Sequence, residues 1–481
     1  MIAREPGTAH TDLGNAERLV ARHGQDLRYV SQWGWLAWDG RRWERDTTGE
    51  SVRRAKETAR HMLAEATTLE STTERQLLAK HALASERAGS IMAMLQLGQS
   101  EPAVVARPED FDRAPLLLTV KNGTIDLRTG ELREWRREDM ITKCAPVAFE
   151  PAADCPRWKR FLEDVMQGSA ALIGFLRRAI GYSLTGDTRE QCLFFLHGTG
   201  ANGKGALIRT IEALLGDYFK QADFASFLER RSEGPKEDLA HLVGARFVAA
   251  SEAGDGRKFA EGLLKTITGQ DTLSVRLLHR DRFEYRPPFK LWLAANAKPT
   301  ISGGDEGMWR RMLLVPFQRT ISRSEQDQTL EPALQGEELP GILRWAVEGC
   351  LEWLEVGLRI PEEILAATGE YRTEMDVVSR FIQEQCVLGP NESEMGSVLL
   401  ERLNSTVQKW ERKRGNDLAA GLKRAGFKFV HTNRGNRWIG LRLRAWQNKD
   451  DVNGVTGQQV RNNGSPFNKQ LEELDELRFN Q

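Results

Sequence analysis

The sequence has few cysteines, and they form none of the patterns found in metal or disulfide sites. Its five cysteines are scattered through 481 residues, without a CxxC pair or a nearby histidine set. This spacing argues against a zinc knuckle, an iron–sulfur cluster and a disulfide framework, and it is typical of a reducing cytosol. The sequence also lacks an apolar N-terminal run and any apolar stretch as long as a membrane-spanning helix. We therefore expect a cytoplasmic protein with no membrane partner.

The chain has no excess of charge of either sign. Its 68 Lys and Arg residues balance 68 Asp and Glu residues, so any nucleic-acid surface must come from a local patch. Internal repeats and coiled-coil heptads are also absent. The length suggests about three domains, and 40% hydrophobic with 28% charged residues is a composition of folded proteins.

Composition and turn signals divide the chain into six regions. They are an aromatic-rich and helical region (1–110), a region of strands and helices (111–185), an α/β core (186–330), a helical segment (331–388), a basic module (389–446) and a linker with a tail (447–481). In the α/β core, from residue 192 to about 318, apolar strands alternate with helices, which predicts a parallel sheet.

Shorter patterns predict individual elements in the first two regions. The pairs Asp39-Gly40, Asn122-Gly123 and Thr129-Gly130 are typical hairpin turns between strands. A long helical stretch is expected over 51–97, because it is rich in helix-forming residues. Two more helices are expected over 158–166 and 170–184.

The most specific motif is a glycine-rich loop between an apolar strand (191–197) and a helix that begins at Lys204. In such a loop, glycines let backbone N–H groups turn toward phosphate oxygens, and the helix N-terminus adds partial positive charge. The lysine supplies a mobile cation for the β- and γ-phosphates. We therefore predict an ATP site formed by Gly198, Thr199, Gly200, Ala201, Asn202, Gly203, Lys204 and Gly205.

One position departs from the phosphate-loop pattern. The residue after the lysine is usually Ser or Thr, whose hydroxyl ligates Mg²⁺, but here it is Gly205. We expect Mg²⁺ to be held by water, by the nucleotide phosphates and by acidic residues further along the chain.

Two polar residues follow later apolar strands. Glu252 follows the strand 245–251, where it could hold Mg²⁺ through water and polarise the attacking water. Asn296 follows the strand 291–295, where its amide could orient the lytic water or contact the γ-phosphate. A surface glutamate and a turn asparagine are the simpler alternatives.

Two adjacent arginines, Arg310 and Arg311, precede the strand 313–317. One of them, with Arg311 slightly preferred, could reach the γ-phosphate of ATP in a neighbouring subunit and neutralise transition-state charge. The alternative is a structural ion pair with Asp305 or Glu306.

The segment 272–285 mixes cations with apolar and aromatic residues, as a loop that grips nucleic acid would. We predict a hairpin that projects into a ring channel; the alternative is a solvated hairpin without a ligand. The candidate DNA-binding residues are Arg276, His279, Arg280 and Arg282, with Lys265 on the preceding helix as a weaker candidate.

The C-terminal module carries the strongest local charge. Between residues 409 and 444 there are eleven Lys or Arg residues and only two acidic residues. A helix over 415–425 followed by a hairpin with a turn at 433–436 predicts a winged-helix outline that binds duplex DNA; the alternative is a basic subdomain that packs on its own ring. The candidate residues are Lys423, Arg424, Arg434 and Arg437.

Taken in this order, the motifs resemble those of the superfamily 3 helicases, specifically the primase–helicases of phages, plasmids, satellites and poxviruses. Segments 11–16, 38–43, 122–127 and 339–346 resemble the same family. The resemblance implies an AAA+-type P-loop core. Together with the helicase-associated segments and the winged-helix outline described above, the expected fold is α/β, with an N-terminal mixed α/β helicase-associated domain and a C-terminal winged-helix-like module. It also implies hexameric rings with ATP and Mg²⁺ at subunit interfaces, and single-stranded DNA in the channel.

The resemblance also assigns roles to the residues singled out above. Lys204 would be the phosphate-binding lysine, Glu252 the acidic Walker B residue and Asn296 the polar sensor. Arg310 or Arg311 would be the arginine finger that acts on the neighbouring subunit. The segment around His279 and Arg280 would be the hairpin that grips DNA.

Longer relatives carry a primase domain ahead of the helicase. This chain starts almost directly at the helicase-associated region and has no zinc-binding cysteines. We expect no primer synthesis by this chain alone, and a separate primase as a possible partner.

The leading hypothesis is an ATP-dependent, ring-forming DNA helicase for replication of a phage, plasmid or integrated mobile element in a bacterial cell or infected host. The first alternative is an ATP-binding, DNA-binding initiator or switch without efficient unwinding, which Gly205 motivates. The second is a defence or packaging ATPase with a similar core.

Overall fold

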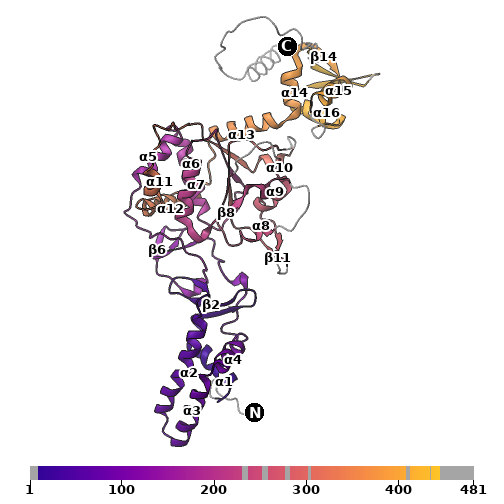
Figure 1. Cartoon of the computed structure of the whole chain (residues 1–481). Helices are drawn as coiled ribbons and strands as arrows, with labels where there is room; N and C mark the ends of the chain where they lie inside the picture. Colours follow the sequence, from indigo (N-terminus) through magenta and orange to yellow (C-terminus); the bar gives the residue numbers. More distant parts are fainter. Residues whose placement is uncertain are drawn as a thin grey trace.

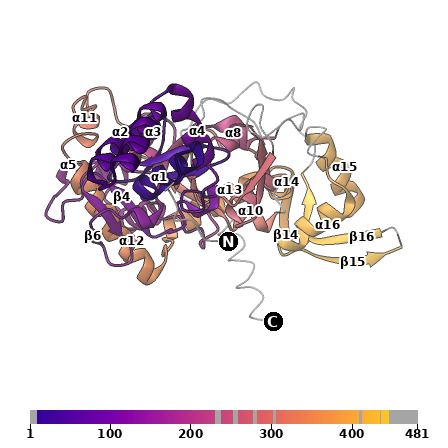
Figure 2. The same ribbon diagram turned by 90° about the horizontal axis from the view of Figure 1, so that it is seen from below.

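The computed structural model describes residues 9–229, 237–251, 258–276, 282–301, 305–407, 412–433 and 435–444. These residues form an elongated molecule in three parts (Figure 1). The N-terminal helices and strands lie at one end, the α/β core lies in the middle, and helix α13 leads to a C-terminal module. The view from below also shows the C-terminal module standing apart from the core (Figure 2).

The N-terminal part combines a three-stranded antiparallel sheet with four helices. Trp38 pairs with Trp43 across the Asp39-Gly40 turn, and Asp39 Oδ1 accepts hydrogen bonds from the backbone N–H groups of the next two arginines at 2.7 and 2.8 Å. This confirms the predicted hairpin. The elements are α1 (Asp12–His23), β1 (Leu27–Val30), β2 (Gly34–Trp38), β3 (Trp43–Arg45), α2 (Glu50–Thr68), α3 (Thr72–Ser85) and α4 (Ala88–Gly98).

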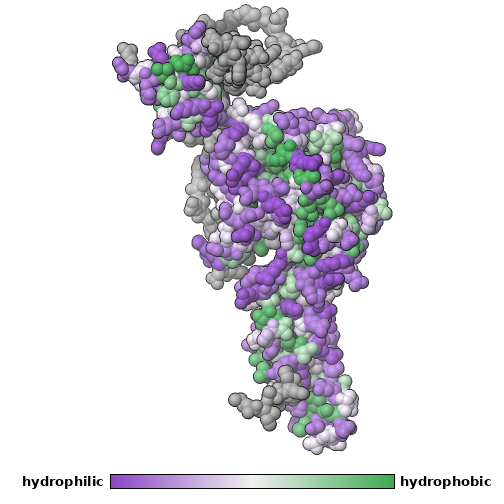
Figure 3. All heavy atoms as spheres, turned by 180° about the vertical axis from the view of Figure 1, so that it is seen from behind, coloured by the Kyte–Doolittle hydropathy of each residue, from purple (hydrophilic) through white to green (hydrophobic). Residues whose placement is uncertain are grey.

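The helical stretch expected over 51–97 is divided into three helices. The first ends at Thr68, and Ser71 caps the second by accepting a hydrogen bond from the N–H of Glu74. Such a cap satisfies one of the free N–H groups of a helix start, so the chain can turn back and pack α3 against α2. Apolar side chains show on this part of the surface among polar ones (Figure 3).

The second part begins with another antiparallel sheet and ends with two helices. The Asn122-Gly123 and Thr129-Gly130 turns join its strands as predicted. The elements are η1 (Pro108–Asp110), β4 (Leu117–Val120), β5 (Gly123–Asp126), β6 (Glu131–Arg133), η2 (Arg137–Asp139), α5 (Pro156–Val165) and α6 (Ala170–Ser183). The last two confirm the helices expected over 158–166 and 170–184.

A five-stranded sheet in the order β13-β7-β12-β9-β8 forms the core, and every neighbouring pair of strands is parallel. The strands are β7 (Leu193–His197), β8 (Phe219–Asp223), β9 (Phe247–Ser251), β12 (Lys290–Ala295) and β13 (Met312–Pro316). Every residue of β12 is buried, as expected of a parallel strand covered on both faces. The predicted α/β core with a parallel sheet is thus confirmed.

Further elements of the core lie between these strands or follow β13. They are α7 (Lys204–Leu215), η3 (Gly216–Tyr218), η4 (Phe224–Phe227), α8 (Glu237–Ala240), α9 (Glu261–Thr268), β10 (Leu273–Arg276), β11 (Arg282–Tyr285), α10 (Glu306–Trp309), α11 (Leu330–Leu334), α12 (Leu339–Val356) and α13 (Glu362–Met375).

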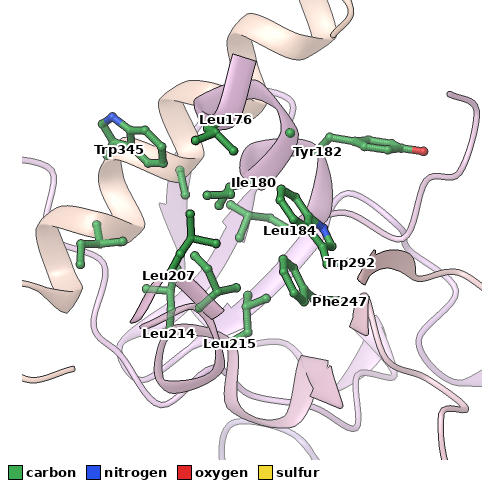
Figure 4. Close-up of a cluster of buried hydrophobic side chains, with 14 of the residues drawn as sticks. Leu176, Ile180, Tyr182, Leu184, Leu207, Leu214, Leu215, Phe247, Trp292 and Trp345 are labelled. Atoms are coloured by element: carbon green, nitrogen blue, oxygen red, sulfur yellow. The ribbon is translucent and has the colours of Figure 1, made fainter. Parts of the chain in front are cut away.

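Aromatic side chains fill one face of the sheet. The ring of Trp292 stacks on Phe194 and Phe247, with ring centroids 4.2 and 5.0 Å apart. Helices α6, α7 and α12 cover this face, and Figure 4 shows Leu176, Ile180, Tyr182, Leu184, Leu207, Leu214, Leu215 and Trp345 around the two aromatic residues Phe247 and Trp292. Stacked rings buried from water make this layer rigid, so it holds the strand ends in place.

Two buried cations join the second part to the starts of β9 and β12. Arg246 donates to the carbonyls of Leu184 (2.8 Å) and Leu117 (2.7 Å). Lys290 Nζ donates to the carbonyls of Thr185 and Asp187. Burial lowers the pKa of Lys290 well below its usual value. The carbonyls just past the end of α6 favour a cation, so this end of the sheet is structural.

The C-terminal module contains α14 (Val377–Gln385), β14 (Cys386–Met395), α15 (Gly396–Thr406), α16 (Gly415–Arg424), β15 (Lys428–Thr432) and β16 (Gly435–Leu443). Its strands form an antiparallel sheet in the order β14-β16-β15. The predicted helix and hairpin are confirmed, and α14, which the sequence places in the preceding helical region, packs into the core of the module. None of the described helices in the molecule is long and apolar enough to cross a membrane.

Candidate nucleotide-binding site

The glycine-rich loop joins the C-terminal end of β7 to the start of α7. Strand β7 lies between β12 and β13, and the chain crosses to the far side of β7 only to form β13. In open α/β sheets, ligands bind at such a reversal of strand order, outside the carboxyl ends of the strands. The fold therefore puts the loop at the position where a ligand site is expected.

Two loop glycines are required by close packing. A Cβ atom at Gly198 would lie 2.2 Å from the carbonyl oxygen of Phe317, and one at Gly203 would lie 2.6 Å from Cγ1 of Val165. Gly203 also has a φ of 86°, which side chains with a Cβ rarely adopt. The loop is thus held against β13 on one side and α5 on the other.

Lys204 is the central side chain of the site. It is only 7% exposed, and its Nζ donates to the carbonyl of Gly198 (2.7 Å), to Oδ1 of Asn202 (3.1 Å) and to Oδ1 of Asn296 (3.0 Å). Burial lowers the pKa of Lys204 to about 8. The ammonium therefore rests on neutral oxygen atoms that anionic phosphate oxygens can replace.

The structure brings Lys204 into contact with both Asn202 and Asn296, but the two asparagines differ in burial. Asn296 is exposed at the end of β12, while Asn202 is buried and its Nδ2 donates to the carbonyl of Phe317 at 3.2 Å. We infer that Asn202 braces the loop, whereas Asn296 faces the ligand space.

A cavity of about 1010 Å³ opens beside the loop, at the upper end of the range for small-molecule sites. Besides loop residues and Asn296, it is lined by Arg157, Arg160 and Asp164 of α5, Arg209 of α7 and Glu331 of α11. These five residues belong to none of the motifs recognised in the sequence. Only Arg209 carries a local signal, because it lies one helical turn beyond Gly205.

The arginine pair lies at the other end of the sheet. Met312, the first residue of β13, pairs with Leu193, the first residue of β7. A strand of this length spans roughly 17 Å, so Arg310 and Arg311 are remote from the phosphate loop of their own chain.

The two arginines differ in exposure. Arg310 is exposed, whereas Arg311 is 9% exposed and its Nη1 donates to the carbonyl of Gly307 at 2.7 Å. Burial lowers the pKa of Arg311. Arg310 is therefore the accessible arginine of the pair, in contrast to the slight preference for Arg311 from the sequence.

The expected alternative partners of these arginines are engaged elsewhere. Asp305 pairs with Lys265 at 2.5 Å, and Glu306 pairs with Arg372. Lys265, a weaker DNA-binding candidate from the sequence, thus lies in the contact between α9 and α10.

The basic hairpin has the predicted arms. Strands β10 and β11 are antiparallel, and Arg276 lies opposite Arg282 at the last described pair. The side chains of Leu273 and Val275 are buried. The face of the hairpin that carries them therefore packs against the core. His279 and Arg280 lie outside the described residues, as does Glu252.

The described candidate residues of the C-terminal module lie on α16 and β16. Lys423 Nζ lies 5.1 Å from the ring centroid of Phe429, and Arg424 lies 3.6 Å from Asp376. Arg437 is exposed on β16, and Arg434 lies outside the described residues. Lys423 and Arg424 therefore already have partners within the module.

Two family models match separate parts of the chain. Residues 16–167 match a family described as "D5 N terminal like", and residues 196–311 match a family of unknown function (DUF5906). The first match covers the region before the phosphate loop, and the second begins at the end of β7.

Three similar proteins come from viruses. A candidate helicase of Acanthamoeba polyphaga mimivirus, L207/L206, is 27% identical over 323 residues, covering 63% of this chain and 33% of that protein. The candidate helicase 022R of Frog virus 3 is 24% identical over 364 residues, covering 58% and 37%. The candidate primase C962R of African swine fever virus is 23% identical over 216 residues, covering 42% and 22%. The chain thus spans about a third of the length of the two helicase relatives.

Among solved structures, the apo form of the C-terminal region of NrS-1 aligns with 71% of this chain and 86% of that chain. The TM-score is 0.40 and the identity is 12%.

Proposed function

We propose that this chain is an ATP-dependent DNA helicase that acts in replication. The N-terminal family match and the viral relatives support a D5-like primase–helicase family. The observation that carries the proposal is the position of Lys204 between the glycine-rich loop and Asn296, beside a cavity of about 1010 Å³. A cation beside a glycine-rich loop and a helix N-terminus, at the carboxyl end of a parallel sheet, is suited to binding a nucleoside triphosphate.

The proposed core is an AAA+-type P-loop fold of superfamily 3. Its support is the order of strands around the loop: β12, which is followed directly by Asn296, lies on one side of β7, and β13, which follows the arginine pair, lies on the other. In this arrangement Asn296 can orient water or contact the γ-phosphate from the neighbouring strand.

Hydrolysis in this proposal depends on positioning and charge. The N–H groups of the loop and the N-terminus of α7 bind phosphate oxygens. The ammonium of Lys204 exchanges its contacts with Gly198 and Asn296 for contacts with the β- and γ-phosphates. Arg310 neutralises developing charge in the site of an adjacent subunit, because it is exposed and remote from its own loop. An oligomer, which we propose to be a hexameric ring, is therefore needed for activity.

The described residues fit ATP better than they fit a protein-held Mg²⁺. Position 205 has no hydroxyl, and no group of three or more His, Cys, Asp or Glu within the described part of the chain could hold a metal ion. Glu252 stays a prediction for holding Mg²⁺ through water. We assign no step to the metal.

DNA binding is proposed at two places. The arms of the β10–β11 hairpin present Arg276 and Arg282 at its described end, for single-stranded DNA in the channel of the ring. The C-terminal module has the order helix, strand, two helices and two strands, which supports a winged-helix-like module that binds duplex DNA through the Arg437 face.

The test is ATP hydrolysis with and without single-stranded DNA. We expect DNA to stimulate turnover by the wild type, and we expect Lys204→Ala and Glu252→Gln to abolish it. A wild type that binds ATP and DNA but does not turn over would favour the initiator or switch, for which Gly205 is the specific motivation. Turnover without unwinding of a forked duplex would favour a packaging or defence ATPase.

A further inference from the structure

The guanidinium of Arg209 covers the one loop position that departs from the phosphate-loop pattern. Arg209 follows Gly205 by one turn of α7, and a Cβ atom built at Gly205 would lie 3.0 Å from Nη1 and 3.3 Å from Nη2 of Arg209. A serine or threonine at position 205 would place its Cβ atom at this short distance, so the guanidinium would have to shift. The guanidinium and a hydroxyl side chain therefore compete for one place beside the loop.

The guanidinium is held there by an exposed ion pair. Nε of Arg209 donates to Oε2 of Glu331 at 2.8 Å, and Nη2 donates to Oε1 of the same carboxylate. The hydrogen bond with Glu331 raises the pKa of Arg209. The two side chains are 53% and 37% exposed, and both line the cavity beside Lys204. Exposed pairs of this kind contribute little to stability, so a triphosphate with several negative charges can draw the guanidinium away from Glu331.

We propose that Arg209 binds the phosphates of ATP from the position that a Mg²⁺-ligating hydroxyl occupies in other phosphate loops. The proposal rests on ATP binding at Lys204, and it explains why Gly205 is tolerated: the small residue leaves room for the guanidinium. A guanidinium presents paired N–H donors that match two phosphate oxygens, and it keeps its charge at any physiological pH. In other phosphate loops, the hydroxyl after the lysine holds Mg²⁺, which supplies positive charge next to the phosphates. Arg209 thus supplies part of that charge in this chain.

A structural role for Arg209 makes a different prediction. If the arginine only ties α7 to α11, then removing either partner of the ion pair weakens the site equally. If Arg209 binds phosphate, Glu331 is its competitor in the free protein. Glu331→Gln then leaves ATP affinity unchanged or improves it, whereas Arg209→Ala lowers it.

The experiment is equilibrium titration of the full chain with a fluorescent ATP analogue, on variants checked for the wild-type circular dichroism spectrum. We expect Arg209→Ala to raise the Kd about tenfold, in line with loss of one charge-assisted hydrogen bond. Arg209→Lys should recover part of this loss. The matched control is Arg128→Ala, which removes an exposed arginine paired with Asp126 outside the cavity and should leave the Kd unchanged.

Gly205→Ser provides a second, independent readout. The Cβ of the new side chain requires the guanidinium to shift away from position 205, so this variant should also bind the analogue more weakly. In the double variant Gly205→Ser with Arg209→Ala, the serine no longer meets a guanidinium and its hydroxyl is present. The losses of ATP-analogue affinity caused by the two single substitutions should therefore not add. Removal of Mg²⁺ with EDTA should weaken the double variant more than it weakens the wild type.

Wild-type affinity in Arg209→Ala, or an equal loss in Arg209→Ala and Glu331→Gln, would overturn the inference, as would equal Mg²⁺ dependence of the wild type and the double variant. Failure of the proposed function has another signature: Lys204→Ala would then bind the analogue as well as the wild type. A wild type that binds no analogue would overturn both.

Discussion

The ammonium of Lys204 lies 3.0 Å from the amide oxygen of Asn296. The lysine begins the helix after β7 and the asparagine directly follows β12, so the contact links two neighbouring strands at their carboxyl ends. Because the same ammonium also donates to Gly198, one cation connects the loop to the adjacent strand. This contact is the geometric basis for the proposed site and for the first prediction.

ATP affinity should fall as the pH rises through 8. Burial lowers the pKa of Lys204 to about 8 in the free protein, and contact with phosphate raises it in the complex because the charged form is stabilised. Only the protonated amine binds phosphate well, so affinity is fully present below pH 8 and is lost above it. We expect about a tenfold higher Kd at pH 9 than at pH 7.

The measurement is titration of an ATP analogue at several pH values, with Lys204→Arg as the control. An arginine does not titrate in this range, so any affinity that this variant retains should not change with pH. A wild-type Kd that is constant from pH 7 to pH 9 would contradict the assignment of Lys204.

Arg310→Ala should reduce ATP turnover by a factor on the order of 10³ without weakening ATP binding. The reason is that Arg310 is exposed and lies at the sheet end remote from its own loop. Arg311→Ala should instead lower the thermal midpoint, since Arg311 is buried and bonded to Gly307.

Mixing of two inactive variants tests whether Arg310 acts across a subunit boundary. Subunits with Lys204→Ala and subunits with Arg310→Ala can together form a site with an intact loop and an intact arginine. We expect part of the turnover to return on mixing, and no return on mixing Lys204→Ala with Lys204→Arg. Mixed samples without any gain would show that the arginine does not serve a neighbour.

Much of this arrangement follows from local sequence patterns, and some of it does not. The apolar runs of β7 and β12 and the loop between β7 and α7 predict a parallel sheet with Lys204 and Asn296 at one edge. In contrast, Arg209 and Glu331 are charged residues on exposed helix surfaces, where many such residues occur without a ligand. Their proximity depends on how α11 folds back on α7, which no short segment encodes.

Local sequence patterns also do not predict which of Arg310 and Arg311 is exposed. Both follow α10, and only the packing of Arg311 against Gly307 shows which of the two stays exposed. The sequence predicts one helical stretch over 51–97, whereas the structure has three helices there. The breaks could not be predicted because the residues at which they occur are also common within helices.

Gly198→Ala should abolish ATP-analogue binding. The added methyl group would lie 2.2 Å from the carbonyl oxygen of Phe317, so the loop has to move away from β13 and from the position that directs its N–H groups at phosphate. Gly89→Ala is the matched control, since nothing lies within 4 Å of a Cβ at this helical position. The control should bind normally and gain up to about 1 kcal/mol in stability.

Equal binding by Gly198→Ala and the wild type would argue against a phosphate-binding role for the loop. Equal loss in both glycine variants would point to a general effect of substitution.

Trp292→Ala should lower the free energy of unfolding by about 3–5 kcal/mol. The indole is fully buried and stacks on Phe194 and Phe247, so the substitution leaves a cavity under α6 and α7. Leu77→Ala, on the exposed face of α3, should change it by less than about 0.5 kcal/mol. Urea unfolding followed by circular dichroism gives both values; similar values for the two variants would contradict the assigned core.

Unwinding of a forked DNA duplex with ATP tests the central claim most directly. We predict strand separation by the wild type with ATP, none with a non-hydrolysable analogue, and none by Lys204→Ala or Arg310→Ala. A wild-type oligomer that hydrolyses ATP on DNA and leaves the fork paired, or a Lys204→Ala variant that still separates the strands, would contradict the account.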